Sequence, residues 1–150
     1  MKEIDKELIY TDMAFKDKNG LFEFIADELK KKGCVTETYE EAIKTREENF
    51  PTGFKLMGIN IAMPHADPQH SKADKLVVLT LREPVEFQNA EDKEKLDVNM
   101  VFCMVFQNRD KHIDYLMKLS NLIQDREKLL KIKNSGTSEE IYGILNKIFG

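Results

Sequence analysis

The sequence predicts an α/β (α+β mixed) fold, in which a mixed β-sheet is flanked by helices on both faces. Helical periodicity occupies the first and last thirds of the chain, whereas short apolar runs bounded by turns occupy the middle third. The run over residues 98–106 is apolar at nearly every position, which is typical of a central strand covered on both faces. No repeat, low-complexity tract or Pro/Gly-rich linker divides the 150 residues, so we predict a single domain over residues 1–150.

The first third is expected to contain one strand and two helices, over residues 7–15, 21–33 and 38–48. β-Branched and aromatic residues predict the strand, and Asn19-Gly20 after it predicts a turn. Lysines followed by Gly33 suit the negative end of the first helix and a left-handed cap. Glu41 stands three residues after Thr38, which is the spacing of a capping box at the start of the second helix.

The rest of the chain is expected to contain strands over residues 60–63, 75–81 and 98–106, followed by helices from Asp110 and after Thr137. The first of these helices has one apolar stripe, formed by Ile113, Leu116, Met117, Ser120 and Ile123. Thr137 is the expected cap of the final helix, with Glu140 three residues later. That helix turns a second apolar set inward, formed by Ile141, Ile144, Leu145 and Ile148.

Charge, cysteine content and hydropathy exclude several classes of protein. The formal net charge is −4 and the pI is near 5.5, so the basic face of a nucleic-acid-binding protein is not evident. Cys34 and Cys103 belong to no C-x-x-C pair, and we expect reduced thiols rather than a disulfide. The N-terminus lacks the apolar segment of a signal peptide, and the longest apolar run, residues 100–106, is too short to cross a bilayer. We therefore expect a soluble, cytoplasmic protein.

The stretch INIAMPHADPQH, residues 59–70, contains the strongest candidate for a reactive side chain, His65. Pro64 fixes its own φ and restricts Met63 to extended geometry, so the backbone that enters His65 is stiff. A neutral imidazole is nucleophilic and can accept a phosphoryl group covalently. The alternative is that His65 is a polar residue at the start of a surface loop.

His112 is a second candidate, near the start of the helix expected from Asp110. It shares a face with Leu116, Leu119 and Ile123, so we expect it to point toward the buried side. There it either meets His65 in space or is a histidine at the edge of the core. The positive end of the helix would favour a phosphate nearby.

Arg46 is the third candidate, near the end of the second helix. Its guanidinium suits phosphate oxygens, although an arginine at this place is also commonly solvated. The turn signal at residues 51–53 could bring Arg46 toward the strand that precedes His65. Thr52 in that turn could supply a hydroxyl to the site or simply stabilise the turn.

A metal site is a competing interpretation, because His65, Asp67, His70 and Asp74 lie close in sequence. Their spacing matches no common zinc motif. The sequence also lacks a P-loop, a dinucleotide-binding glycine motif and a G-x-S-x-G elbow, so nucleotide use and acyl transfer have no support.

The segments TREENFPTG and INIAMPHAD, followed by HIDYLMKLSNLIQD, together resemble the enzyme IIA domain of the bacterial phosphotransferase system (PTS), fructose–mannitol class. The resemblance covers almost the whole chain, and the combination of motifs is more specific than any part. A proline before Thr52-Gly53 and a longer segment between Gly53 and Pro64 depart from the fructose type. Both features are more similar to the galactitol-type IIA proteins.

The resemblance implies a phosphotransferase that carries a phosphoryl group from phospho-HPr to a cysteine of the IIB component, for uptake of a sugar or sugar alcohol. His65 matches the phosphorylated histidine of the family, Arg46 the arginine of its motif, and His112 the second histidine of the mannitol and fructose types. The membrane component IIC would be involved only indirectly. No bound metal, nucleotide or other cofactor is implied, and the transported sugar stays open.

Two partner proteins that bind in turn at one histidine need a docking surface, to which Phe54, Leu56 and Met57 could contribute. These residues could instead pack into the protein's own core. Two other functions also stay open. One is a regulatory protein on the same fold, controlled by phosphorylation of His65, and the other is a small metal-binding or ligand-binding domain.

Overall fold

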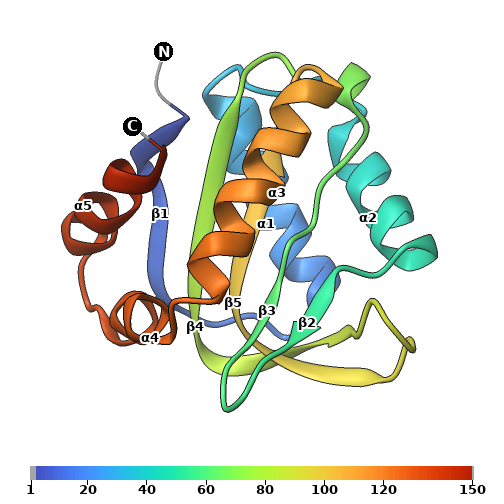
Figure 1. Ribbon diagram of the computed structural model, residues 1–150. Helices are drawn as coiled ribbons and strands as arrows, with labels where there is room; N and C mark the ends of the chain where they lie inside the picture. Colours follow the sequence, from blue (N-terminus) through green and yellow to red (C-terminus); the bar gives the residue numbers. More distant parts are fainter. Residues whose placement is uncertain (1–2, 150) are drawn as a thin grey trace.

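The computed structural model describes residues 3–149, which form a five-stranded mixed sheet with helices on both faces (Figure 1). In sheet order the strands are β1 (Ile4–Met13), β4 (Lys75–Gln88), β5 (Lys95–Val105), β3 (Asn60–Ala62) and β2 (Gly53–Lys55). The helices are α1 (Lys18–Lys31), α2 (Tyr39–Asn49), α3 (Arg109–Ile123), α4 (Arg126–Asn134) and α5 (Ser138–Phe149), with a short 3₁₀ helix η1 (Pro68–His70). β1 pairs with β4 and β3 with β5 in parallel, whereas β4–β5 and β2–β3 are antiparallel. The predicted mixed sheet with flanking helices is confirmed.

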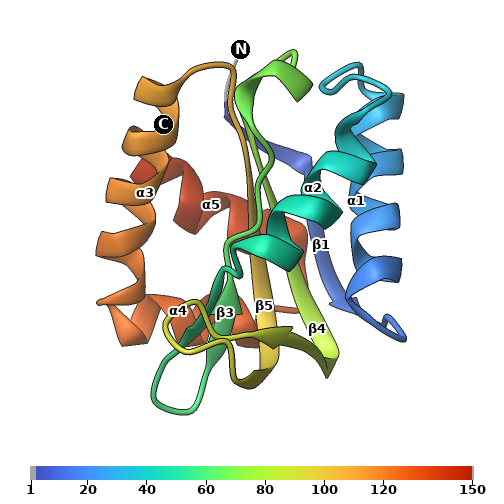
Figure 2. The same cartoon turned by 90° about the vertical axis from the view of Figure 1, so that its right-hand side faces the viewer.

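The sheet separates two layers of helices (Figure 2). An apolar core lies on each face of the sheet. α1 and α2 cover one face, and α3, α4 and α5 cover the other. Alternate side chains of β5 enter the two cores: Val101, Cys103 and Val105 on the side of α1 and α2, and Met100, Phe102 and Met104 on the side of α3. All of these side chains are buried, which confirms that the apolar run is a central strand.

The boundary between the first strand and the first helix differs from the prediction. β1 begins earlier than expected, because Ile4 already pairs with Leu76 of β4. The expected turn at Asn19-Gly20 is wrong, since both residues lie in the first turn of α1. The Asp17 carboxylate accepts a hydrogen bond from the backbone N–H of Gly20 at 2.8 Å, and this cap brings the pair into the helix.

The two predicted threonine caps behave differently. α2 lies where it was expected, but Thr38 forms no side-chain cap, because its Oγ1 lies 2.7 Å from His70 Nδ1 and 2.7 Å from Thr36 Oγ1. At α5, by contrast, Thr137 Oγ1 accepts a hydrogen bond from the N–H of Glu140 at 3.3 Å. Tertiary neighbours therefore decide whether such a hydroxyl serves its own helix.

β2, α4 and the short helix η1 were not predicted, and β4 and β5 are longer than expected. β4 and β5 continue past the predicted segments as a hairpin, in which Val85 pairs with Val98. β2 has only three residues, and α4 is a short helix capped by Asp125, whose side chain accepts from the N–H of Lys128 at 3.2 Å. Among residues 3–149, none of the helices has the length and apolar composition that a membrane span requires.

Candidate functional site

His65 lies just beyond the end of β3, where the backbone still runs parallel to β5. The N–H of Met104 donates to the carbonyl oxygen of Pro64 at 3.0 Å, and His65 forms a parallel bridge with Met104. His65 is only 7% exposed, so it is not a solvated residue of a surface loop. The sheet and the proline ring together hold the backbone from which this imidazole projects.

The two nitrogens of the His65 ring differ in their surroundings. Nδ1 lies 3.2 Å from the carbonyl oxygen of Met63. Because a carbonyl oxygen only accepts, this contact assigns the proton of the neutral ring to Nδ1. Nε2 then carries the free lone pair, and it is buried without a hydrogen-bond partner in the part of the chain that the structure describes. The free nucleophilic nitrogen of His65 is therefore Nε2.

His112 comes from the first turn of α3 and lies against His65. The centroids of the two imidazole rings are 4.6 Å apart, with an angle of 49° between the rings. The ring of Phe106 stacks on the His112 ring, with 4.3 Å between the two centroids and an interplanar angle of 5°. The structure therefore brings the two predicted histidines together, and the Phe106 ring holds the second one in place.

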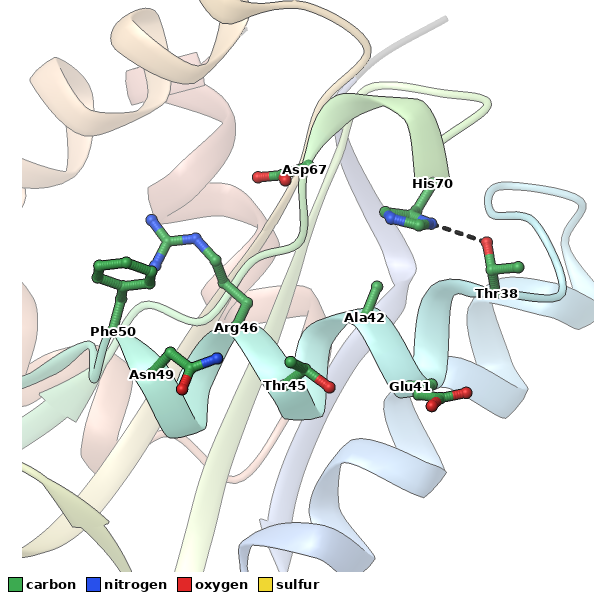
Figure 3. Close-up of a pocket in the computed structure, with 9 residues that line it drawn as sticks. All are labelled: Thr38, Glu41, Ala42, Thr45, Arg46, Asn49, Phe50, Asp67 and His70. Atoms are coloured by element: carbon green, nitrogen blue, oxygen red, sulfur yellow. Dashed lines mark hydrogen bonds between the residues drawn. The ribbon is translucent and has the colours of Figure 1, made fainter.

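Arg46 projects from the last turn of α2 (Figure 3). Its guanidinium carbon lies 4.8 Å from the centroid of the Phe50 ring, a cation–π contact with an exposed aromatic side chain. Its Nη1 atom is buried and, within residues 3–149, has no hydrogen-bond partner. A buried guanidinium nitrogen without a partner is ready to donate to an anion.

Burial and nearby positive charge keep both histidines neutral. Burial lowers the pKa of His65 to about 4, and the neighbouring His112 and Arg46 also lower it, against the opposing effects of the Met63 carbonyl and Asp67. Burial lowers the pKa of His112 as well, with further contributions from Arg46 and Arg109. At neutral pH the site thus contains an uncharged nucleophile beside a permanent cation.

Three chain segments contribute one buried nitrogen each that has no hydrogen-bond partner within the described part of the chain. These atoms are His65 Nε2, His112 Nε2 and Arg46 Nη1, and the charge of Arg46 acts on both rings. Unpaired buried polar atoms are uncommon in folded proteins, and a cluster of them indicates a place for a polar ligand. A nucleophile, a fixed cation and the positive end of α3 suit an anion with several oxygens, such as a phosphoryl group.

Thr52 does not offer its hydroxyl to this cluster. Its Oγ1 donates to Glu47 Oε1 at 2.7 Å and its backbone N–H donates to Glu47 Oε2 at 2.7 Å, so it stabilises the turn. Sequence reasoning missed Glu47 and also Phe106. Glu47 follows Tyr39 and Ile43 at intervals of four residues, and this helical spacing was a signal that it faces inward. The stacking of Phe106 on His112 had no signal in the sequence.

The residues of the competing metal site do not assemble into a ligand set. Nowhere in residues 3–149 do three His, Cys, Asp or Glu side chains gather as a metal site would require. His70 instead contacts Thr38 through Nδ1, at the far end of a cavity of about 450 Å³ (Figure 3). Arg46 and Asp67 line the same cavity, which lies along α2.

Comparisons with known proteins identify the family of the chain. Residues 3–148 match the family described as "Phosphoenolpyruvate-dependent sugar phosphotransferase system, EIIA 2". The galactitol-specific EIIA component of the PTS of Escherichia coli K12 is 29% identical over 116 residues, which are 77% of each chain.

Two solved structures share the fold. The E. coli enzyme IIA-Mtl, solved in complex with phosphorylated enzyme IIB-Mtl, is 22% identical, with a TM-score of 0.78 and coverage of 94% of this chain and 95% of that one. The nitrogen regulatory protein IIA-Ntr of Neisseria meningitidis is 24% identical, with a TM-score of 0.73 and coverage of 95% and 96%. Since the family match spans residues 3–148, the protein belongs to the EIIA type 2 family of the phosphoenolpyruvate-dependent sugar phosphotransferase system, and it is a phosphoryl-transfer component of that system.

Proposed function

We propose that the protein carries a phosphoryl group on Nε2 of His65, which it accepts from phospho-HPr and passes to a cysteine of a IIB component. The observation that carries the proposal is the state of this one atom. Nε2 is buried and has no partner among residues 3–149, while Nδ1 is engaged by the Met63 carbonyl, so Nε2 is the ring nitrogen that is free to react. The low pKa of His65, about 4, keeps that lone pair available at neutral pH.

In the first transfer, the Nε2 lone pair attacks phosphorus in line with the bond to HPr. The new N–P bond forms as the old bond breaks, and the electron pair of the old bond stays with HPr. Arg46 and His112 stabilise the charge on the equatorial oxygens, Arg46 through its unpaired Nη1 and His112 through a proton on Nε2. For this role His112 must bear its proton on Nε2, or be protonated on both nitrogens when the negatively charged phosphoryl group arrives.

In the second transfer, a IIB thiolate attacks the same phosphorus from the opposite side. The N–P bond breaks and its electron pair returns to Nε2, which restores the starting tautomer because Nδ1 keeps its proton throughout. Arg46 neutralises the charge of the phosphoryl group both when it arrives from HPr and when it leaves for IIB. Because Arg46 is partly exposed in the last turn of α2, it favours positioning of the phosphoryl group over binding so tight that the group could not leave.

An apolar surface beside His65 supports docking of partner proteins. The large hydrophobic side chains that are exposed in residues 3–149 are Phe50, Phe54, Met57, Ile113, Leu116 and Met117. Phe54 faces Ile113, Leu116 and Met117 across a groove of about 480 Å³. Leu56 differs, because it is partly buried against the core beneath α3, α4 and α5. Clustered exposed apolar side chains are typical of an interaction site, and methionines suit successive partners.

The galactitol-type EIIA provides the best guide to the transported compound, because its sequence is similar over 77% of both chains. We assign the protein to a cytoplasmic, galactitol-like branch, in which the membrane component IIC receives the phosphoryl group only through IIB. A regulatory role is the second candidate, because a nitrogen regulatory IIA has the same fold. Both functions use the same phosphorylated histidine, and they differ in whether the phosphoryl group is transferred to a IIB cysteine.

Transfer to IIB tests the proposal. The protein is labelled with radioactive phosphoenolpyruvate, enzyme I and HPr, separated from them, and mixed with galactitol-type or mannitol-type IIB. We expect rapid transfer to a IIB, most rapid with the galactitol type, and none to a IIB whose acceptor cysteine is replaced by serine. If the label stays on the protein with every IIB tested, the transport role is refuted and the regulatory role takes its place.

A further inference from the structure

We propose that Glu47 is a positioning residue for the phosphoryl-transfer reaction, acting on His65 through Thr52 and Met63. The proposal rests on the function proposed above, because it assigns to Glu47 a role at the same histidine. Glu47 is 1% exposed although it is a charged residue on a helix that also has exposed glutamates. Buried carboxylates are rare unless their oxygens are satisfied, so the partners of Glu47 show its role.

The carboxylate of Glu47 binds a single residue with both oxygens. Oε1 accepts the hydroxyl hydrogen of Thr52 and Oε2 accepts its backbone N–H, each at 2.7 Å. Two short, charge-assisted hydrogen bonds from one residue fix its position and its orientation. The end of α2 is thereby clamped to the turn that leads into β2.

Thr52 transmits this position to the catalytic segment. Its carbonyl oxygen accepts the N–H of Met63 at 3.2 Å, and the carbonyl oxygen of Met63 lies 3.2 Å from His65 Nδ1. A continuous series of hydrogen bonds therefore runs from Glu47 to the imidazole. Thr52 and Met63 each donate through their own N–H toward Glu47 and accept through their own carbonyl oxygen from the side of His65, so the series fixes both residues in the backbone. The Met63 carbonyl at its end sets the tautomer on which the reaction depends.

Gly53 allows the clamped turn to lie directly against the backbone of β4. A Cβ atom at this position would lie 2.4 Å from the carbonyl oxygen of Gln88, closer than any side chain allows. The Gly53 carbonyl oxygen also accepts the N–H of Ala90 at 2.9 Å. The Thr52-Gly53 pair thus has two separate roles, a hydroxyl for Glu47 and a close backbone approach to the β4–β5 hairpin.

A purely structural role for Glu47 would predict a different result from a positioning role. If Glu47 only stabilised the turn, its removal would lower the free energy of unfolding and leave the proton of His65 on Nδ1. If Glu47 positions Met63, its removal shifts part of the His65 population to the tautomer with the proton on Nε2. That tautomer has no free lone pair at the reacting nitrogen, so transfer slows while the affinity for HPr is unchanged.

The experiment measures the ¹⁵N chemical shifts of the His65 ring and the kinetics of phosphorylation by phospho-HPr. Glu47→Gln places an amide group against one of the two Thr52 donors, and Thr52→Val removes the hydroxyl but retains the backbone N–H. Thr52→Ser restores the hydroxyl and is the rescue variant. Glu48→Gln changes the exposed neighbour on the same helix and is the matched control.

We expect a mixed tautomer in Glu47→Gln and Thr52→Val, with kcat reduced roughly two- to tenfold, in proportion to the lost fraction of the reactive tautomer, and the KM for phospho-HPr little changed. Thr52→Ser and Glu48→Gln should keep the wild-type tautomer and rate. Folded Glu47→Gln and Thr52→Val proteins with the wild-type tautomer and rate would overturn the proposal. A mixed tautomer in these variants, together with a wild-type protein that accepts no phosphoryl group, would uphold the positioning role and refute the proposed function instead.

Discussion

The imidazole rings of His65 and His112 lie 4.6 Å apart between centroids, and each has a buried Nε2 without a hydrogen-bond partner among the described residues. The segment just after β3 supplies the first ring and α3 the second, and Arg46 of α2 adds a third nitrogen without a partner among these residues. No group in residues 3–149 satisfies these atoms, so the site is arranged for a ligand that does. This relationship underlies the following predictions.

Replacing Arg46 should slow phosphorylation without unfolding the protein. Arg46→Ala removes the donor aimed at the phosphoryl oxygens, and kcat for labelling by phospho-HPr should fall roughly 10²–10³-fold. Arg46→Lys should recover only part of this loss, because an ammonium group cannot reproduce the guanidinium fork. Arg82→Ala, which breaks an exposed ion pair with Asp12 on β1, is the control and should react at the wild-type rate. An unchanged rate in Arg46→Ala would remove this residue from the site.

Replacing His112 should cost less than replacing His65. In His112→Gln a carboxamide keeps a donor near the former Nε2, so the rate should fall roughly tenfold, whereas His65→Ala should accept nothing. Rapid-quench labelling of the two variants under identical conditions makes the comparison. A loss in His112→Gln as complete as that in His65→Ala would show that His112 does more than orient the phosphoryl group.

The burial of His65 should make the free energy of unfolding depend on pH. The folded protein holds this pKa at about 4, below the value of 6.5 expected in the unfolded chain, so the unfolded chain binds more protons between these values. Stability should therefore fall as the pH drops from about 6.5 toward about 4. Between about pH 7.5 and about pH 5 the loss due to His65 should be on the order of 2 kcal/mol.

Urea unfolding of wild type and His65→Gln at several pH values checks this expectation. The variant lacks the titrating ring, so its free energy of unfolding should change less over this range. An equal pH dependence in both proteins would contradict the assignment of the effect to His65.

The exposed apolar surface should affect recognition of HPr rather than chemistry. Met57 is 86% exposed and Met117 is 61% exposed, so replacing them with alanine should leave stability nearly unchanged. If they contact phospho-HPr, the double variant should raise the KM roughly tenfold with little change in kcat. Lys131→Ala, an exposed change on α4, is the control. A lowered kcat with a normal KM would indicate that this surface does not bind HPr.

Periodicity predicted most of the fold, because local sequence determines elements with a clear apolar pattern. β5 could be predicted since Met100 to Val105 are all apolar, and α5 since Thr137 caps it. The prediction of a turn at Asn19-Gly20 was wrong because the carboxylate of Asp17 accepts a hydrogen bond from the N–H of Gly20 and caps the helix there. β2 was missed because its three residues become a strand only by pairing with β3.

The candidate site could be predicted only as a set of residue types. Spacing placed His112 on an inward face, but the stack with Phe106 and the contact with His65 join segments that are distant in sequence. Arg46, Glu47 and Glu48 illustrate the same limit. Among the described residues Arg46 has a buried nitrogen without a hydrogen-bond partner, the carboxylate of Glu47 is buried, and the carboxylate of Glu48 is exposed to solvent. The three residues are adjacent and charged, so only the tertiary structure distinguishes their environments.

The intact mass of the protein after incubation with phosphoenolpyruvate, enzyme I and HPr tests the central claim most directly. Wild type should gain one acid-labile phosphoryl group, which ³¹P spectra should place on Nε2 of a histidine, and His65→Ala should gain none. Full labelling of folded His65→Ala, or no gain by folded wild type, would contradict the assignment of His65 as the phosphoryl carrier.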